Sequence, residues 1–261
     1  MAKRTTVFDL WSQKGKKKWP QTHIDTSKEA EAAYKAGIEI ISCEPDHHFK
    51  DVRKVAPTAF LSVGIKHGLV SSAQEAIKKG FEIMEMGADA IYCSHSINFI
   101  EAMAKEGIPI TAHVGLVPNL STWTNFRAVG KTAEEAFKVY QNVKDLESAG
   151  AACVEVEVVP VEIADYITKN TRMITMGMGC GDVCDTQYLF CNDILGTNKG
   201  HYPRHAKKYV DISSKEDELQ KLRVDGFKLF VDEVKNGQYP EDKHLIKMEE
   251  KELDNFLNKI K

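Results

Sequence analysis

The sequence predicts an α/β protein built as a (β/α)8, or TIM, barrel with extra C-terminal helices. Short apolar runs alternate with helical patterns along most of the chain. A glycine closes several helical stretches just before the next apolar run, at Gly37, Gly87, Gly107 and Gly150. A glycine between a helix and a strand is typical of the αβ turn in a repeating βα unit. About eight such units in 261 residues fit one closed parallel barrel.

Eight segments are expected to form the barrel strands, six of them rich in apolar and β-branched residues and two weaker. In chain order they are 21–25, 38–43, 59–65, 88–93, 108–113, 152–158, 172–177 and 187–191. Helices are expected between them, at 27–36, 72–86, 99–106 and 132–149. An open doubly wound sheet is the alternative, which the sequence disfavours because no glycine-rich phosphate loop opens a helix.

The composition indicates a globular protein that acts on a small molecule. The formal net charge is -3, from 35 basic and 38 acidic residues, so we expect no nucleic-acid partner. No apolar run approaches the roughly 20 residues of a membrane span, so we expect no membrane partner either. Most of the six cysteines lie in or beside apolar runs. That placement favours free thiols and a cytoplasmic location.

The last part of the chain differs from the rest in composition. We expect a single barrel domain over 1–261, in which 213–261 form a C-terminal helical extension. This extension is highly charged and carries an apolar stripe: Leu219, Leu222, Phe227, Phe230 and Val231. We expect its helices to cover the barrel or a neighbouring subunit.

Seven motifs of the chain resemble ketopantoate hydroxymethyltransferase and occur in the order of that family. Together they are specific, although each alone is weak. They are Ala36–Ile41, Ala112–Pro118, Val156–Ile163, Met176–Gly181, Asn192–Gly196, Gly200–Tyr209 and Asn236–Pro240.

The resemblance implies a fold, a reaction and an assembly. The fold is a (β/α)8 barrel of the phosphoenolpyruvate mutase and isocitrate lyase superfamily. The reaction transfers a hydroxymethyl unit from methylenetetrahydrofolate to a branched 2-oxo acid, with a divalent metal that holds the enolate. The resemblance also implies a homo-oligomer. The residues alone assign no cofactor.

The chain departs from the family at the family's metal ligands. The family's Gly-Asp-Ser triplet falls on residues 44–46 and its aspartate on Pro45, unless the register shifts by one. A second family aspartate falls on Gly64, and the strand-four lysine and glutamate fall on Tyr92 and Ser94. Because Mg²⁺ requires hard oxygen ligands, the sequence predicts that the family's Mg²⁺ site is absent.

Two functional positions of the family are retained. Glu157 matches the catalytic glutamate and lies in an otherwise apolar strand, where a carboxylate is costly to bury without a role. We expect it to act as acid or base, while Glu155 on the same face is expected to support a buried polar group. His113 matches the substrate-contacting histidine and is expected to orient or polarise a carbonyl. The alternative for His113 is a purely structural hydrogen bond.

Lys66 is the third catalytic candidate. It follows Gly64 by two residues, so both side-chain positions share one face of the strand. Its ammonium group is expected to hold anionic charge in place of the metal, or to form a Schiff base. The alternative is a solvated loop lysine. The expected substrate-binding residues are Tyr92, Ser94, Cys43, Gly64 and Met178.

A rewired metal site is a further hypothesis. Histidine, thiolate and carboxylate groups gather at the predicted barrel mouth and suit Zn²⁺ or Fe²⁺ better than Mg²⁺. The candidate ligands are Glu44, Asp46, His67 and His95, with Cys43, His47, His48 and Cys93 nearby. The alternative is a polar loop rim that binds no metal.

These features predict a hydroxymethyltransferase-like enzyme without the family's Mg²⁺ site. It would make or break a C–C bond next to the carbonyl of a small 2-oxo acid or a related compound. Two alternatives stay open at the level of sequence. One is a non-catalytic barrel that binds a metabolite or a partner. The other is a metal-dependent 3-methyl-2-oxobutanoate hydroxymethyltransferase with displaced ligands.

Overall fold

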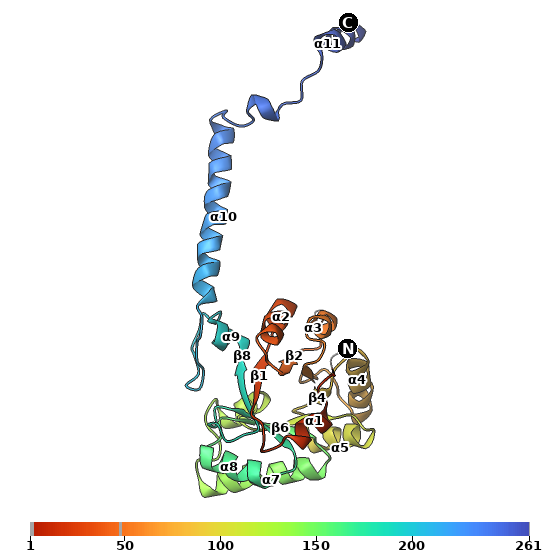
Figure 1. Cartoon of the computed structure of the whole chain (residues 1–261), viewed down its shortest axis with the longest axis vertical. Helices are drawn as coiled ribbons and strands as arrows, with labels where there is room; N and C mark the ends of the chain where they lie inside the picture. Colours follow the sequence, from red (N-terminus) through yellow and green to blue (C-terminus); the bar gives the residue numbers. More distant parts are fainter. Residues whose placement is uncertain (1–2, 47–48, 261) are drawn as a thin grey trace. The chain divides into compact units, whose positions relative to one another are not determined.

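The computed structural model describes residues 3–46 and 49–260. The chain divides into two compact units, one ending at Val210 and the other beginning at Asp211. Figure 1 shows the first unit as a ring of strands and helices, and the second as a series of helices. The two units are described separately below.

The first unit is a closed barrel of eight parallel strands in sequential order, as the sequence predicts. Each strand pairs in parallel with its neighbours in the chain, and the first pairs with the last. The strands are β1 Trp19–His23, β2 Ile40–Cys43, β3 Phe60–Gly64, β4 Ala90–Tyr92, β5 Ile110–Gly115, β6 Cys153–Glu157, β7 Ile174–Met178 and β8 Thr186–Phe190.

The helices of this unit alternate with the strands. They are α1 Val7–Ser12, α2 Ser27–Lys35, α3 Phe49–Val55, α4 Ala73–Glu85, α5 Ile97–Lys105, α6 Ser121–Thr124, α7 Ala133–Ser148, α8 Val161–Lys169 and α9 Cys191–Leu195, with the 3₁₀ turn η1 Pro118–Leu120. Thr26, Ser72 and Thr132 cap three of them, each accepting a hydrogen bond from a backbone N–H in the first turn.

The four glycines expected after helices all have positive φ, as predicted. They end α2, α4, α5 and α7 and lead the chain into the next strand. This repeated turn directs the carboxyl ends of the strands to one rim of the barrel. In TIM barrels that rim carries the functional site.

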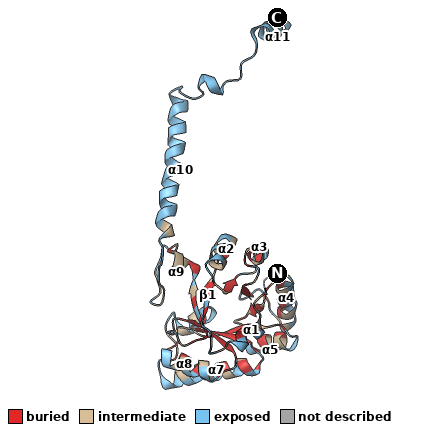
Figure 2. Ribbon diagram, in the orientation of Figure 1, coloured by how far each residue is buried: buried red, intermediate tan, exposed pale blue. Residues whose placement is uncertain are grey.

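The interior of the barrel is apolar at one end and polar at the other. Leu10 of α1 packs with Phe60, Ile174 and Met176 at the amino ends of the strands. A buried polar layer follows above them, in which Gln21 hydrogen-bonds to Ser42 and Thr186, and Ser62 to Thr111. A larger apolar layer lies between the strands and the helices. Figure 2 shows the buried residues concentrated on the strands and the inner faces of the helices.

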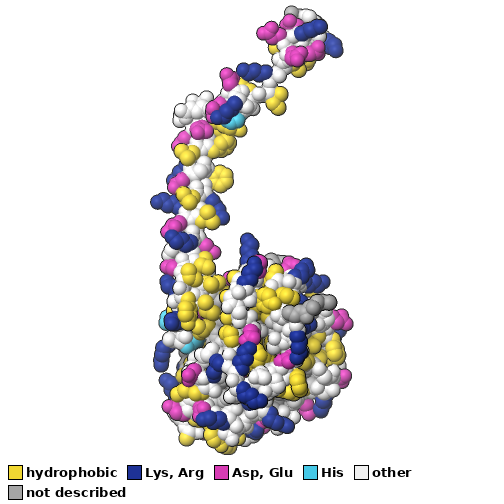
Figure 3. Space-filling view, viewed as in Figure 1, with side chains coloured by type: hydrophobic (Ala, Val, Ile, Leu, Met, Phe, Trp, Pro, Cys, Tyr) yellow, Lys and Arg dark blue, Asp and Glu magenta, His cyan; other side chains and the backbone are white. Residues whose placement is uncertain are grey.

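The second unit contains α10 Ile212–Lys235, the 3₁₀ turn η2 Asp242–His244 and α11 Glu250–Lys259. It begins two residues before the extension that the sequence predicts over 213–261, and the assignment of that segment as an extension of a single barrel domain stays a prediction. The apolar stripe of α10 is exposed within the described structure: Leu222 is 67% exposed and Phe227 72%. Figure 3 shows apolar side chains interspersed with charged ones along this helix. That the stripe covers the barrel or another subunit stays a prediction.

Within the described residues, no helix is long and apolar enough to cross a membrane.

Candidate active site

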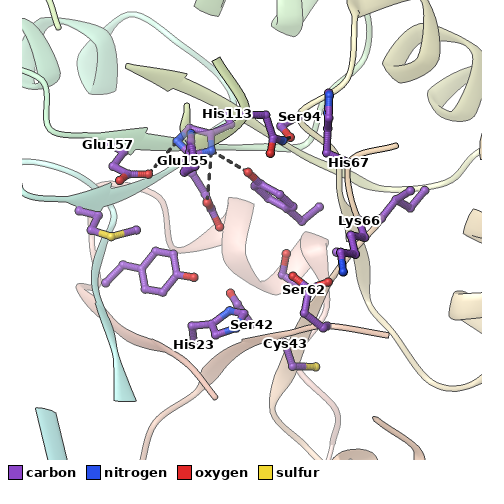
Figure 4. Close-up of a pocket in the computed structure, with 18 of the residues that line it drawn as sticks. His23, Ser42, Cys43, Ser62, Lys66, His67, Ser94, His113, Glu155 and Glu157 are labelled. Carbon is purple, nitrogen blue, oxygen red and sulfur yellow. Dashed lines mark hydrogen bonds and ion pairs between the residues drawn. The ribbon is translucent and has the colours of Figure 1, made fainter. Parts of the chain in front are cut away.

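A cavity of about 330 Å³ opens at the carboxyl ends of the barrel strands. Side chains from β1 to β8 line it, together with residues of the loops that follow them. Figure 4 shows His113, Glu155 and Glu157 grouped on one side and Lys66 on another, with Ser42, Ser62 and His23 between them. Ser42 and Ser62 of the polar layer inside the barrel line this cavity.

His113 is the centre of a buried polar cluster. Its side chain is 2% exposed, and its Nδ1 atom lies 2.7 Å from the Tyr92 hydroxyl oxygen, within hydrogen-bond distance. Its Nε2 atom lies 3.1 Å from Glu157 Oε2, but no hydrogen bond of good geometry joins them. Glu155 Oε2 lies 3.8 Å from Nδ1. One imidazole ring therefore contacts a phenol and two carboxyl groups.

The two carboxyl groups beside His113 differ in their environment. The Glu155 side chain is 7% exposed and the Glu157 side chain 14%. The pKa of Glu155 is raised to about 7, mainly by burial; His113 opposes the rise, and the charge on Glu157 adds to it. Two neighbouring carboxyls in one pocket suit acid–base chemistry when one of them is neutral near pH 7.

The opposite wall of the cavity is built around Gly64, at the end of β3. A Cβ atom at this position would lie 3.5 Å from both carboxylate oxygens of Glu44 and 3.6 Å from the Tyr92 ring. The carboxylate of Glu44 therefore lies beside a strand position that has no side chain. Burial raises the pKa of Glu44, and the positive charge of Lys66 opposes that rise. Glu44 and Lys66 thus face the cavity as an interacting pair of opposite charges.

Tyr92 connects the two walls. Its hydroxyl group meets His113, and Ser94 lines the cavity two residues further along the chain. Asn119, on η1, donates from Nδ2 to Ser94 Oγ over 2.7 Å. Burial raises the pKa of Tyr92 well above its usual range, and the charge of Glu155 adds to the rise. The phenol therefore keeps its proton at neutral pH.

The backbone around Glu157 is unusual. Val158 has φ +51°, a left-handed conformation that β-branched residues rarely adopt. Its N–H donates to Met178 O and its C=O accepts from Val129 N, which holds it in place. A Cβ atom at Gly115, whose φ is +90°, would lie 2.2 Å from Glu157 O. The strand end that carries Glu157 is therefore closely constrained, and such strain is typical of functional sites.

The structure brings most of the predicted site residues to this cavity. All three catalytic candidates, Glu157, His113 and Lys66, line it, as do the five substrate-binding candidates Tyr92, Ser94, Cys43, Gly64 and Met178. Their convergence follows from the regular inward alternation of residues along the barrel strands. Their roles stay predictions.

The predicted metal ligands do not gather in one place. Glu44 and His67 line the cavity, whereas Asp46 and His95 are not among its lining residues. His95 instead stacks on His67, with ring centroids 5.0 Å apart. His47 and His48 lie outside the described residues. In the part of the chain that the structure describes, three ligand-type atoms converge at Asp25, Glu29 and Cys191, and these four candidates form no such group.

Several lining residues were not expected from the sequence. The rings of His23 and Phe190 meet in a tilted arrangement at the ends of β1 and β8, with centroids 4.8 Å apart. Tyr188 and Asn119 also line the cavity. For His23, Phe190 and Tyr188, the sequence signal was the alternation of polar and aromatic residues in two weakly apolar strands. Asn119 lies in a loop, and no local sequence pattern indicates it.

The comparisons with known proteins identify the family. The sequence model of ketopantoate hydroxymethyltransferase matches residues 21–242. The chain belongs to the ketopantoate hydroxymethyltransferase family. A 3-methyl-2-oxobutanoate hydroxymethyltransferase of Clostridium novyi is 35% identical over 212 residues, 76% of this chain and 74% of that protein. One of Thermoanaerobacter sp. is 30% identical over 225 residues, 84% of this chain and 80% of that protein.

The match to a third relative covers nearly the whole length of this chain. The 3-methyl-2-oxobutanoate hydroxymethyltransferase of Staphylothermus marinus is 28% identical over 283 residues, 97% of this chain and 99% of that protein. Among solved structures, 2,3-dimethylmalate lyase, described as a PEP mutase/isocitrate lyase superfamily member, has a TM-score of 0.57 at 10% identity. The match covers 86% of this chain and 88% of the lyase. It supports the barrel fold.

Family membership bears on two of the hypotheses drawn from the sequence, a hydroxymethyltransferase-like enzyme and a non-catalytic barrel. The protein is a hydroxymethyltransferase-like enzyme, as predicted, and the family evidence favours catalysis over a purely binding barrel. The resemblance to the family places its metal-ligand positions at Pro45, Gly64 and Ser94. Pro45 and Gly64 have no side-chain atom that could bind a metal ion. The hydroxyl oxygen of Ser94 accepts a hydrogen bond from Asn119. This set of residues does not fit the carboxylate-rich coordination that Mg²⁺ requires.

Proposed function

We propose that this enzyme forms or breaks a C–C bond next to the carbonyl of a small 2-oxo acid, with charged side chains in place of the family's divalent metal. One observation carries the proposal: His113, Glu157 and Lys66 line one cavity at the carboxyl end of the barrel. The relatives' names indicate 3-methyl-2-oxobutanoate as the first substrate to test.

The proposed reaction begins with proton removal by Glu157. The C–H bond next to the carbonyl breaks, the proton moves to the carboxylate, and the electron pair forms an enolate. His113 donates a hydrogen bond to the carbonyl oxygen, where negative charge develops. The enolate carbon then attacks a one-carbon unit at the oxidation level of formaldehyde. With formaldehyde as this unit, its C=O π bond breaks, and the new alkoxide takes the proton back from Glu157, which yields a hydroxymethyl group.

Lys66 is proposed to hold the substrate carboxylate from the opposite wall. Its ammonium group supplies positive charge at the cavity, where the family uses a metal ion. The Glu44 carboxylate interacts with Lys66. A Schiff base between Lys66 and the substrate carbonyl is the covalent variant of this role.

A second candidate is a metal-dependent enzyme with displaced ligands. The position of Glu44 favours it, because its two carboxylate oxygens lie beside Gly64, where the resemblance places a metal-binding aspartate. Carboxylate oxygens are suitable ligands for Mg²⁺. In this version Glu44 would replace that aspartate. Lys66 would bind the substrate but would not take the place of the metal ion.

Metal analysis combined with an activity assay separates the two candidates. Purified protein would be analysed for metal content and assayed with 2-oxo acids and either formaldehyde or methylenetetrahydrofolate, with and without a chelator. We expect turnover that survives chelation and a metal content well below one ion per chain. Activity lost on chelation and restored by Mg²⁺ would instead support displaced ligands. Borohydride reduction with substrate, followed by mass spectrometry of Lys66, tests the Schiff-base variant.

We also propose that the chain works as a homo-oligomer in a reducing cytoplasm. The exposed apolar stripe of α10 supports the first point, because large exposed apolar patches commonly mark interfaces. The six cysteines support the second, since all are free and buried. Light scattering on the full chain measures the assembly, and a monomer at micromolar concentration would contradict it.

A further inference from the structure

Glu155 is a buried acidic residue that the proposed reaction does not use. It lies two residues before Glu157 on the same face of β6, one step deeper in the barrel, and it lines the cavity. Its neighbours across the sheet are His113 on β5 and Met176 on β7. Figure 4 shows its side chain directed into the cavity. Its carboxyl group is therefore placed to meet a ligand that enters there.

The Glu155 carboxyl group forms no hydrogen bond within the described residues. Its side chain is only 7% exposed, and the 3.8 Å between its Oε2 atom and His113 Nδ1 is too long for a hydrogen bond. In the described part of the chain, no lysine or arginine acts on it either. A buried polar group without a partner costs free energy, which a ligand that supplies the partner would recover. Glu155 is therefore an open position for a polar ligand atom.

The titratable groups that act on Glu155 or respond to its charge come from four strands. They are Tyr92 of β4, His113 of β5, Cys153 and Glu157 of β6, and Tyr188 of β8. Burial raises the pKa of both phenols and of the thiol, so these three groups are neutral at pH 7. The pKa of Glu155 itself is raised to about 7, mainly by burial. Glu155 therefore carries a proton below this pH.

The proton decides which ligands Glu155 can bind. A protonated carboxyl group donates a hydrogen bond, whereas an ionised one only accepts. An ionised carboxylate would also repel an anion. A bound anion in turn favours the protonated form, because two like charges in one site disfavour ionisation. Anion binding and the proton on Glu155 thus reinforce each other.

We infer that Glu155 binds the substrate as a neutral carboxylic acid and donates a hydrogen bond to the 2-oxo oxygen, where the enolate charge develops. One oxygen accepts two hydrogen bonds, so Glu155 and His113 share it. Donors in a buried site stabilise such a charge, a task that the resemblance to the family assigns to a metal ion. The choice of this oxygen rests on the proposed function, whereas a protonated Glu155 in an anion complex can be measured without turnover.

Oxalate is a suitable probe, because it is planar and doubly charged like the enolate of a 2-oxo acid. Its binding to the full-length protein would be measured by calorimetry at pH 6 and pH 8, in buffers of different ionisation enthalpy. EDTA in every buffer removes metal ions that could hold oxalate. We expect the affinity to fall about tenfold from pH 6 to pH 8, because oxalate binds the protonated form. At pH 8 we also expect uptake of close to one proton per oxalate. Oxalate binding without proton uptake, or no binding, would overturn the inference.

Two matched variants assign the proton to one residue. Glu155→Gln keeps an N–H donor at the same position but does not titrate, so we expect its oxalate affinity to be the same at pH 6 and pH 8, without proton uptake. Glu157→Gln makes the same change two residues away on β6 and should keep most of the uptake. Uptake that persists in Glu155→Gln would place the proton on another group and contradict the inference.

A second ligand tests which oxygen Glu155 contacts. 3-Methylbutanoate has the carboxylate and the branched chain of 3-methyl-2-oxobutanoate but no oxygen on carbon 2. We expect far less proton uptake with this ligand at pH 8 than with oxalate. Equal uptake with both ligands would place the hydrogen bond at the carboxylate and overturn the assignment to the 2-oxo oxygen.

Kinetics separates this inference from the proposed function. We expect Glu155→Met, which has no donor, to lower kcat about 10²-fold, whereas Glu155→Gln should retain most of the activity. Turnover of 2-oxo acids without proton uptake on oxalate binding would disprove the role of Glu155 and keep the function. Proton uptake that depends on Glu155, without turnover of any 2-oxo acid, would keep the anion site and remove the function.

Discussion

The two walls of the cavity differ in how they are built. The β5–β6 wall consists of His113, Glu155 and Glu157, which are buried and in contact with one another. The β2–β4 wall is more open, and its charged members are Glu44 and Lys66 around Gly64. By the resemblance, the first wall holds the residues that match the family's histidine and glutamate. The same resemblance predicts that the second wall lacks the family's metal ligands.

This difference separates proton transfer from charge stabilisation. Proton transfer needs groups at fixed distances, and the β5–β6 wall is held by two adjacent strands and a constrained backbone at Val158. Stabilisation of a substrate anion needs only a positive charge at suitable range, which a lysine can supply as well as a metal. The β2–β4 wall could therefore change while the β5–β6 wall stayed the same.

The largest effect is expected on the β5–β6 wall. Glu157→Gln keeps the size of the side chain but removes the base, so we expect kcat to fall about 10²- to 10⁴-fold. Steady-state kinetics would measure the loss, and circular dichroism would confirm folding. Glu162→Gln, an exposed glutamate at the start of α8, is the matched control. Near wild-type activity in Glu157→Gln would remove the proposed mechanism.

The second prediction concerns Glu155 and the pH dependence of stability. Its pKa is 4.5 ordinarily and about 7 in the folded protein. At a pH between 4.5 and 7, Glu155 has lost its proton in the unfolded chain but keeps it in the folded protein. The free energy of unfolding therefore falls as pH rises from about 4.5 to 7 and is level above, a total on the order of 3 kcal/mol.

Glu155→Gln removes this titration and isolates its effect. Urea unfolding of both proteins at pH 5 and pH 8, read as the difference between them, cancels the contribution of other groups. We expect the variant to gain stability relative to wild type as pH rises between about 4.5 and 7. A constant difference between the two proteins over this range would contradict the raised pKa.

On the β2–β4 wall, Lys66→Met is expected to lower kcat/KM by about tenfold to thirtyfold for 2-oxo acids. The reason is the loss of one ammonium group that binds the substrate carboxylate from a partly solvated position. Lys66→Arg should recover part of the activity, and Lys28→Met, an exposed lysine on α2, should have none of the effect. If Lys66→Met left kcat/KM unchanged, Lys66 would be a solvated loop residue without a role in substrate binding.

The smallest effect is expected for Glu44→Gln. With Lys66 as the cation, this change removes only a neighbouring negative charge, so we expect kcat/KM to change by less than about tenfold. Metal content before and after the substitution is the decisive measurement. Loss of both activity and a bound metal in Glu44→Gln would show that the β2–β4 wall still holds an ion through displaced ligands.

The sequence alone was sufficient for the barrel, its strand order and the family. The periodic apolar runs and the glycines after helices are local signals, because they reflect backbone geometry repeated in each βα unit. The inward positions of Glu157 and Lys66 also followed from strand alternation. All eight catalytic and substrate-binding candidates consequently line one cavity.

Tertiary structure decided which of these residues act on one another. Glu44 reaches the space beside Gly64 from the next strand, and Asn119 reaches Ser94 from a loop. Asp46 and His95 lie close in sequence to residues of the cavity wall but do not line it. The contact between the Tyr92 hydroxyl and the His113 ring likewise joins side chains of two strands, β4 and β5. Contacts between distant segments depend on loop paths and side-chain reach, which no local pattern in the sequence determines.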